Sequence, residues 1–214
     1  SIMLLYGSLI PMQIAPEKQN NAQYTYTFKG WTVIGEDRYW SFDTDKVTGN
    51  ITLTPVFEKT VNTYTVIFKN EDGTEYKKYE NVAYGSEILL PTAPTKENTD
   101  STIWAFAGWE GYEEGMTVSG NHEFVATFSS TSASYEVAFV NGEQIIKKET
   151  LAYGTLIIAP DVVPTKDQNE QYNYSFKGWK NFIEGETTVT GNMTFEAEFN
   201  STLRKYTVTY VVDG

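Results

Sequence analysis

Short segments in which apolar and polar residues alternate recur along the chain at a nearly constant interval. One of them reads YTVIF from Tyr64, returns as YEVAF from Tyr135 and again as YTVTY from Tyr206, at intervals of 71 residues. A period of two, rich in aromatic and β-branched residues, predicts β-strands with one covered face. Because the whole pattern repeats, the chain is predicted to be a tandem array of small β units.

The spacing of these segments divides the chain into repeats. We place a first repeat at 1–60, a second at 61–131, a third at 132–202 and the opening strand of a fourth at 203–214. The first repeat lacks the opening strands and carries an insertion at about 35–46. The pattern is that of a segment cut from a longer array.

Each complete repeat is predicted to form four strands. Turn signals follow the opening strand, as EDG at 71–73 and NG at 141–142, and indicate a hairpin. A segment with two prolines separates the second strand from the third, and two prolines exclude a long helix there. We expect this segment to cross over the apolar face of the sheet and cover it.

Several residues mark the same position in successive repeats. The Gly-Trp pair in YTFKGW, WAFAGW and YSFKGW reads as a core anchor if the Gly forms a bulge that turns the Trp inward, and otherwise as a ligand-stacking platform. We favour the core interpretation, because so small a unit needs a large apolar side chain. The structural register residues are Gly30, Gly108 and Gly178; Trp31, Trp109 and Trp179; Tyr6, Tyr84 and Tyr153; and Phe57, Phe128 and Phe199.

The ordered set YTVxF, DG, YG, PTK, FxGW and VTGNxTxxAxF closely resembles the Listeria–Bacteroides repeat, the type found in internalin B. The resemblance covers nearly the whole chain in three registers. It implies a mainly β, β-grasp-like unit of two hairpins joined by the crossover segment. It also implies tandem repeats of bacterial surface and secreted proteins, often between a recognition domain and a cell-wall anchor. The insertion in the first repeat departs from the pattern.

The amino-acid composition limits which partners the chain could bind and where it could be located. A net charge of −12 disfavours nucleic acid as a partner. The absence of cysteine excludes disulfides and thiol chemistry, as in a cytosolic protein or an exported Gram-positive one. Without a run of 18 apolar residues, no direct membrane insertion is expected. The resemblance implies an extracellular or cell-wall-attached location, which the lack of cysteine allows, with any export signal or anchor outside these residues.

Catalytic chemistry has little support in the sequence. A catalytic triad needs a histidine base, and the only histidine is His122, a lone residue at the exit of a turn. The short acidic turns lack the ligand count of a calcium loop, and no cofactor or metal site is predicted. The candidate surface or ligand-contacting residues are aromatic: Trp40 and Tyr39 in the insertion, and Tyr112.

These observations predict a non-catalytic repeat segment that acts as a spacer or stalk and as an adhesion or protein-interaction module. Its partner would be a host or matrix protein or a polysaccharide. The alternative is a carbohydrate-binding module that uses aromatic platforms. A first repeat without opening strands, beside a spare strand at Lys205–Val212, also predicts strand exchange with a neighbouring chain.

Overall fold

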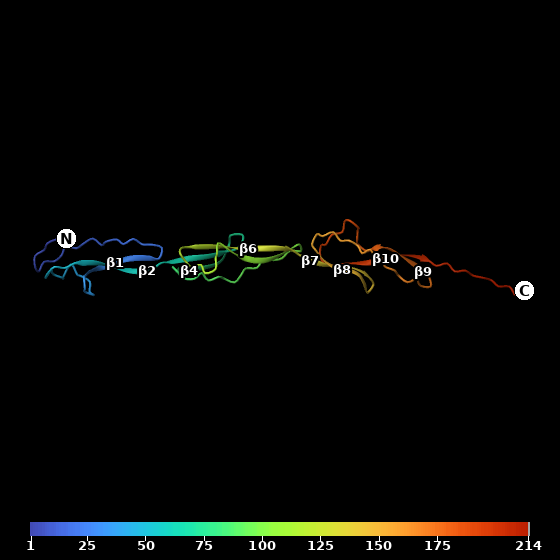
Figure 1. Ribbon diagram of the computed structural model, residues 1–214, viewed down its shortest axis with the longest axis horizontal. Coiled ribbons are helices and arrows are strands. Elements are labelled where there is room, and N and C mark those ends of the chain that lie inside the picture. Colours follow the sequence, from blue (N-terminus) through green and yellow to red (C-terminus); the bar gives the residue numbers. More distant parts are fainter. Residues whose placement is uncertain (214) are drawn as a thin grey trace. The chain divides into compact units, whose positions relative to one another are not determined.

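The computed structural model describes residues 1–213, which form ten β-strands and no helix. With no helix, the described part of the chain has none long and apolar enough to cross a membrane. Gly214, the last residue of the predicted fourth-repeat strand, lies outside the described residues. The strands are shown in Figure 1 and are β1 (Tyr24–Val33), β2 (Leu53–Val61), β3 (Thr63–Lys69), β4 (Glu75–Ala83), β5 (Thr102–Glu110), β6 (His122–Ser132), β7 (Ser134–Asn141), β8 (Gln144–Ala152), β9 (Tyr172–Trp179) and β10 (Met193–Leu203).

The second and third repeats have the same sheet. Each contains four strands, in the order β4-β3-β6-β5 and β8-β7-β10-β9. The pairs β3–β4, β7–β8 and β9–β10 are antiparallel, and the two central strands of each sheet are parallel. The segments at 84–101 and 153–171 cross from one edge strand of the sheet to the other without a helix, which allows the two central strands to be parallel. This arrangement confirms the predicted mainly β fold of two hairpins and a crossover.

The crossover segment is attached to the sheet in the same way in all three repeats. A Tyr-Gly turn begins it, and the glycines have φ angles of +81° at Gly7, +80° at Gly85 and +79° at Gly154, which favour glycine. Their amides donate to carbonyls in the segment before the last strand, with Gly85 N to Val118 O at 2.7 Å and Gly154 N to Val189 O at 2.7 Å. The crossover is thus held over one face of the sheet.

The core of the third repeat lies between the sheet and its crossover. Its buried members are Val137, Phe139, Ile157, Val189 and Phe195, of which none is more than 2% exposed. Val66, Phe68, Ile88, Val118 and Phe124 take the corresponding places in the second repeat. In both repeats the opening strand supplies the first two members, so this strand completes the core.

The first repeat has two strands in the described residues. β1 and β2 form an antiparallel sheet, and a bridge between Leu9 and Lys46 holds the crossover, as Glu87–Thr117 and Leu156–Thr188 do in the other repeats.

The chain divides into two compact units, residues 1–94 with 108–127 and residues 95–107 with 128–214.

The register of the Gly-Trp strands shifts at the glycine. In the first repeat Phe28 is opposite Phe57 and Gly30 is opposite Val56, so Lys29 has no partner residue. In the third repeat the shift falls between Phe176 and Gly178 in the same way. Such a bulge changes which side chains share a face, and Trp31 accordingly packs edge-on against Phe28, with ring centroids 5.9 Å apart.

Candidate functional site

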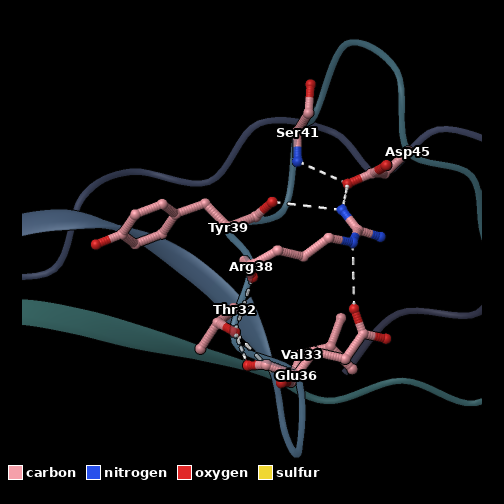
Figure 2. A network of polar contacts seen from close by, with 7 residues as sticks. All are labelled: Thr32, Val33, Glu36, Arg38, Tyr39, Ser41 and Asp45. Atoms are coloured by element: carbon pink, nitrogen blue, oxygen red, sulfur yellow. Dashed lines mark hydrogen bonds and ion pairs between the residues drawn. The ribbon is translucent and has the colours of Figure 1, made fainter.

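The insertion in the first repeat is an ordered polar network. The Thr32 hydroxyl donates to the carbonyls of Glu36 and Arg38, at 2.8 and 3.0 Å. Figure 2 shows the Arg38 guanidinium between two carboxylates, with Nη1 2.5 Å from Asp45 Oδ2 and Nε 3.3 Å from Glu36 Oε2. The Ser41 amide donates to the same Asp45 oxygen at 2.9 Å. Local contacts therefore hold the insertion in one conformation.

The candidate aromatic residues of the insertion lie in different environments. Trp40 is only 8% exposed, so its assignment as a surface residue was wrong. Its backbone amide donates to Trp31 O at 2.7 Å, which joins the backbone of the insertion to the Gly-Trp strand. Tyr39 is 54% exposed, and its ring lies against Gly30, where an added Cβ would come 2.9 Å from Tyr39 Cδ1. Tyr39 is thus the exposed aromatic residue of this segment.

Tyr112, the third candidate, is half-buried. Its ring meets Phe124 edge-on at 5.8 Å, against the core of the second repeat. Tyr112 therefore packs within the second repeat, whereas Tyr39 and Trp40 lie in the insertion of the first repeat. These three residues form no joint platform.

The network lowers the pKa of the Asp45 carboxyl below its ordinary value of 3.8, chiefly through the Ser41 amide and secondly through Arg38. We expect Arg38→Gln to raise the pKa of Asp45 only in part, because the amide remains. Because the pKa of Asp45 is lower in the folded state, its ionised carboxylate stabilises the fold above about pH 4. This stabilisation is lost as the pH falls through the folded-state pKa. A carboxyl-detected NMR titration measures it; a full return to the ordinary value would show that Arg38 alone is responsible.

The three register tryptophans are not equally buried. Trp109 is 7% exposed and packs edge-on against Phe68 at 4.8 Å. Trp179 and Trp31 are half-buried. Trp179 packs against Phe139 at 5.0 Å and Phe176 at 5.3 Å. All three rings therefore contact the interior of their own repeat.

One aromatic residue of the Gly-Trp strand in each repeat has a lysine over one face of its ring. Lys18 lies 4.1 Å from the centroid of Tyr26, Lys96 lies 3.7 Å from that of Trp104, and Lys166 lies 4.4 Å from that of Tyr174. A cation over the ring is attracted by its quadrupole and covers the face that a sugar would stack on. These positions are poor candidates for a carbohydrate platform on that face.

A set of contacts that the sequence did not single out joins each repeat to the next. The tyrosine that opens each repeat donates its hydroxyl to a carbonyl in the preceding repeat: Tyr64 to Ala22 O at 2.5 Å, Tyr135 to Asp100 O at 2.7 Å, and Tyr206 to Glu170 O at 2.5 Å. The sequence marked these tyrosines as strand starts. A carbonyl acceptor has no sequence signal, because every residue carries one.

Backbone bonds reinforce the same junctions. The residue between two repeats donates its amide to the carbonyl before the third strand of the preceding one: Asn62 to Gln23 O at 2.9 Å, Ala133 to Ser101 O at 3.0 Å, and Arg204 to Gln171 O at 2.9 Å. The carbonyls of Asn62 and Ala133 then accept from Tyr84 N and Tyr153 N of the following repeat. Asn62 and Ala133 are therefore bonded to the repeats on both sides.

Removing one junction hydroxyl tests its contribution. We expect Tyr135→Phe to lower the stability of the third repeat by about 1 kcal/mol, the usual net value of one hydrogen bond. It should also increase backbone motion around Ala133, measured by ¹⁵N relaxation. Tyr210→Phe removes a hydroxyl from a side chain that is 87% exposed and is the matched control. Equal effects of the two changes would contradict a role for the junction.

Two structural observations concern metal-binding side chains and the single histidine. Residues 1–213 contain no group of three or more His, Asp or Glu side chains that could hold a metal ion. His122 stacks on Phe124 at 5.8 Å and accepts a hydrogen bond from Ser119 N at 3.4 Å, a local turn contact.

Comparison with known proteins identifies the repeats. The family model of the Listeria–Bacteroides repeat domain matches residues 64–127 and 135–204. Two proteins of Evansella cellulosilytica are each 31% identical to the chain: a "Putative Gly-rich membrane protein" over 98% of the chain and a "Putative membrane protein" over 81%. The chain spans about a quarter of the length of each, 24% in both cases.

A solved structure is also similar. Streptococcal High Identity Repeats in Tandem (SHIRT) domains 3-4 from a cell surface protein are 19% identical, with a TM-score of 0.31, over 66% of this chain and 100% of that one. Repeats of the matched family are typically non-catalytic structural modules. Because its model matches more than half of the residues, and does so twice in tandem, the chain belongs to the Listeria–Bacteroides repeat domain family.

Proposed function

We propose that the chain is a non-catalytic spacer segment of an exported bacterial surface protein, which holds another domain away from the cell wall. The observation that carries this proposal is the recurrence of one junction three times. Tyr64, Tyr135 and Tyr206 make the same hydroxyl contact with the repeat before them. Repeats that each have a core and a bonded junction give an array that resists bending, since the linker is not a free coil.

Distance measurements between spin labels test the spacer role. The chain has no cysteine, so single cysteines at Thr60 and Ser132, both exposed, would carry the only labels. Pulsed electron paramagnetic resonance should give one narrow distance distribution, and Tyr64→Phe, at the junction between the two labels, should broaden it. Small-angle scattering of the unlabelled chain should indicate an elongated particle. A compact globule, or a broad distribution in the unmodified chain, would contradict the proposal.

An adhesive contribution is the second part of the proposal. The insertion of the first repeat exposes Tyr39, at 54%, and Ile34, at 64%, on a segment held in place by the Arg38 network. Exposed aromatic and aliphatic side chains on an ordered loop are suited to contact a host or matrix protein. Surface plasmon resonance against matrix proteins should show binding that Tyr39→Ala weakens. Binding to a glycan array with the same dependence on Tyr39 would instead support the carbohydrate-binding alternative.

A further inference from the structure

The turn between β7 and β8 in the third repeat contains the sequence Asn141-Gly142. Asn141 is opposite Gln144, so the turn has two central residues, and Gly142 is the first of them with φ +62°. A tight hairpin turn of this kind favours glycine at that place, because the conformation is strained for other residues. The fold therefore places a glycine directly after Asn141.

An asparagine that precedes glycine deamidates readily, because glycine has no side chain to hinder attack by its own backbone nitrogen. The Gly142 nitrogen gives up its proton and forms a bond with Asn141 Cγ. The Cγ–Nδ2 bond breaks, the departing nitrogen takes up a proton, and ammonia leaves. Water then opens the succinimide ring and gives aspartate or isoaspartate at position 141. The reaction therefore needs a free Gly142 N–H and a free side-chain amide.

In the folded third repeat both reacting groups are engaged. Gly142 N donates to Glu196 Oε1 at 2.7 Å, and Asn141 Nδ2 donates to Thr165 O at 2.9 Å. Glu196 lies on β10, opposite Val140 in the parallel pairing, and Thr165 lies in the crossover. A carboxylate at this distance disfavours removal of the Gly142 proton, since two negative charges would then be adjacent. Two segments distant in the sequence thus hold the reactive pair.

The second repeat has a different residue pair at the same place. Its hairpin has Asn70 where the third repeat has Asn141, but the next residue is Glu71 rather than glycine. Asn70 Nδ2 donates within its own turn, to Thr74 Oγ1 at 3.0 Å. The side chain of residue 71 hinders attack by its backbone nitrogen, so Asn70 is an internal comparison for Asn141.

We propose that Asn141 is a deamidation site whose reaction is restrained in the folded third repeat by Glu196 and Thr165 O, and released when the hairpin opens. Aspartate at position 141 has no N–H to donate, and it turns a negative charge toward the Thr165 carbonyl. Isoaspartate also adds a carbon atom to the backbone of a two-residue turn. Either product removes the bond between hairpin and crossover, so an opened repeat that has deamidated closes less well. A reversible opening is thereby converted into a lasting covalent change.

Peptide mapping by mass spectrometry after incubation at mildly alkaline pH measures the reaction. Asn141 should deamidate about tenfold or more slowly in the folded chain than in the chain unfolded by urea, the factor that one charge-assisted hydrogen bond supplies. Asn70 in the same urea sample should react far more slowly than Asn141. Equal rates at Asn141 in the folded and unfolded chain would overturn the proposal.

Substitution of Glu196 tests the restraint directly. Glu196→Ala should raise the rate at Asn141 in the folded chain about tenfold, and Glu196→Gln, which keeps an acceptor oxygen without the charge, should give an intermediate rate. Glu198→Ala removes a carboxylate of β10 that pairs with Lys177 and is the matched control. Amide exchange in β7 and β10 verifies that each variant is folded, and Glu196→Gln carries the test if Glu196→Ala lowers that protection. Equal rates in Glu196→Ala and Glu198→Ala would overturn the proposal, as would a slower reaction in Glu196→Ala, which would make Glu196 a base.

Asn141→Asp reproduces one product and tests its consequence. Amide hydrogen exchange should be faster in the turn and in the crossover at 153–171 than in the unmodified chain, because the bond to Thr165 O is lost. Asn141→Ala removes the same donor without adding a charge and should have the smaller effect. Exchange that Asn141→Asp leaves unchanged would contradict the inference that deamidation hinders closure.

Discussion

Phe139→Ala is expected to lower the unfolding free energy of the third repeat by about 3–5 kcal/mol. The side chain is fully buried, and three aromatic rings surround it with centroids at 5.0, 5.4 and 5.0 Å, those of Trp179, Phe182 and Phe195. Truncation removes apolar area from the core and leaves a cavity that these rings cannot fill. A unit of about 70 residues has a stability of roughly 4–10 kcal/mol, so most of it would be lost.

Native-state amide hydrogen exchange measures this effect repeat by repeat. Protection in β7 and β10 should fall sharply, while β3 and β6 of the second repeat should keep most of theirs. Ile158→Ala removes an aliphatic side chain that is 61% exposed in the same repeat and is the matched control. Unchanged protection in β7 would contradict the assigned core, whereas an equal loss in both repeats would show that the junction at Ala133 couples their unfolding.

Alternation in the sequence was sufficient to predict the strands, but it could not give their order. Segments such as YTVIF and YEVAF showed one covered face, and β3 and β7 form there. The parallel pairing of β3 with β6 has no such signal, because a period of two does not record which edges of two strands meet. The resemblance implied two hairpins and a crossover, which the sheet order confirms, whereas the parallel pairing is a finding of the structure.

The insertion shows where sequence reasoning failed. Trp40 has no counterpart in the other repeats, so no comparison between copies could indicate its environment. Its backbone is bonded to Trp31 O, and Arg38 pairs with Asp45 in the same loop; these contacts form only once the loop is folded. The lysines over Tyr26, Trp104 and Tyr174 did have a signal, since a lysine recurs at the same place in APEK and in both PTK motifs.

Trp109→Ala is expected to destabilise the second repeat by about 3–5 kcal/mol, comparable to the effect of Phe139→Ala. The Trp109 ring is 7% exposed and is packed by Phe68 at 4.8 Å and Tyr76 at 5.8 Å. Trp31→Ala should lower the unfolding free energy of its repeat by less, because the Trp31 ring is half-buried in a repeat with two described strands. Urea denaturation of each variant, with hydrogen exchange to assign the affected repeat, gives the comparison.

The same pair of variants separates the two interpretations of the Gly-Trp motif. If the tryptophans are core anchors, truncating each one lowers the unfolding free energy in proportion to its burial. The loss for Trp109→Ala should therefore be larger than for Trp31→Ala, and Trp109→Phe should destabilise less than Trp109→Ala. A ligand-stacking residue behaves in the opposite way, because truncating an exposed platform changes binding and leaves folding intact. Unchanged stability of Trp109→Ala together with lost polysaccharide binding would therefore reverse the interpretation, and would make the half-buried Trp31 and Trp179 the better candidates for contact with a sugar.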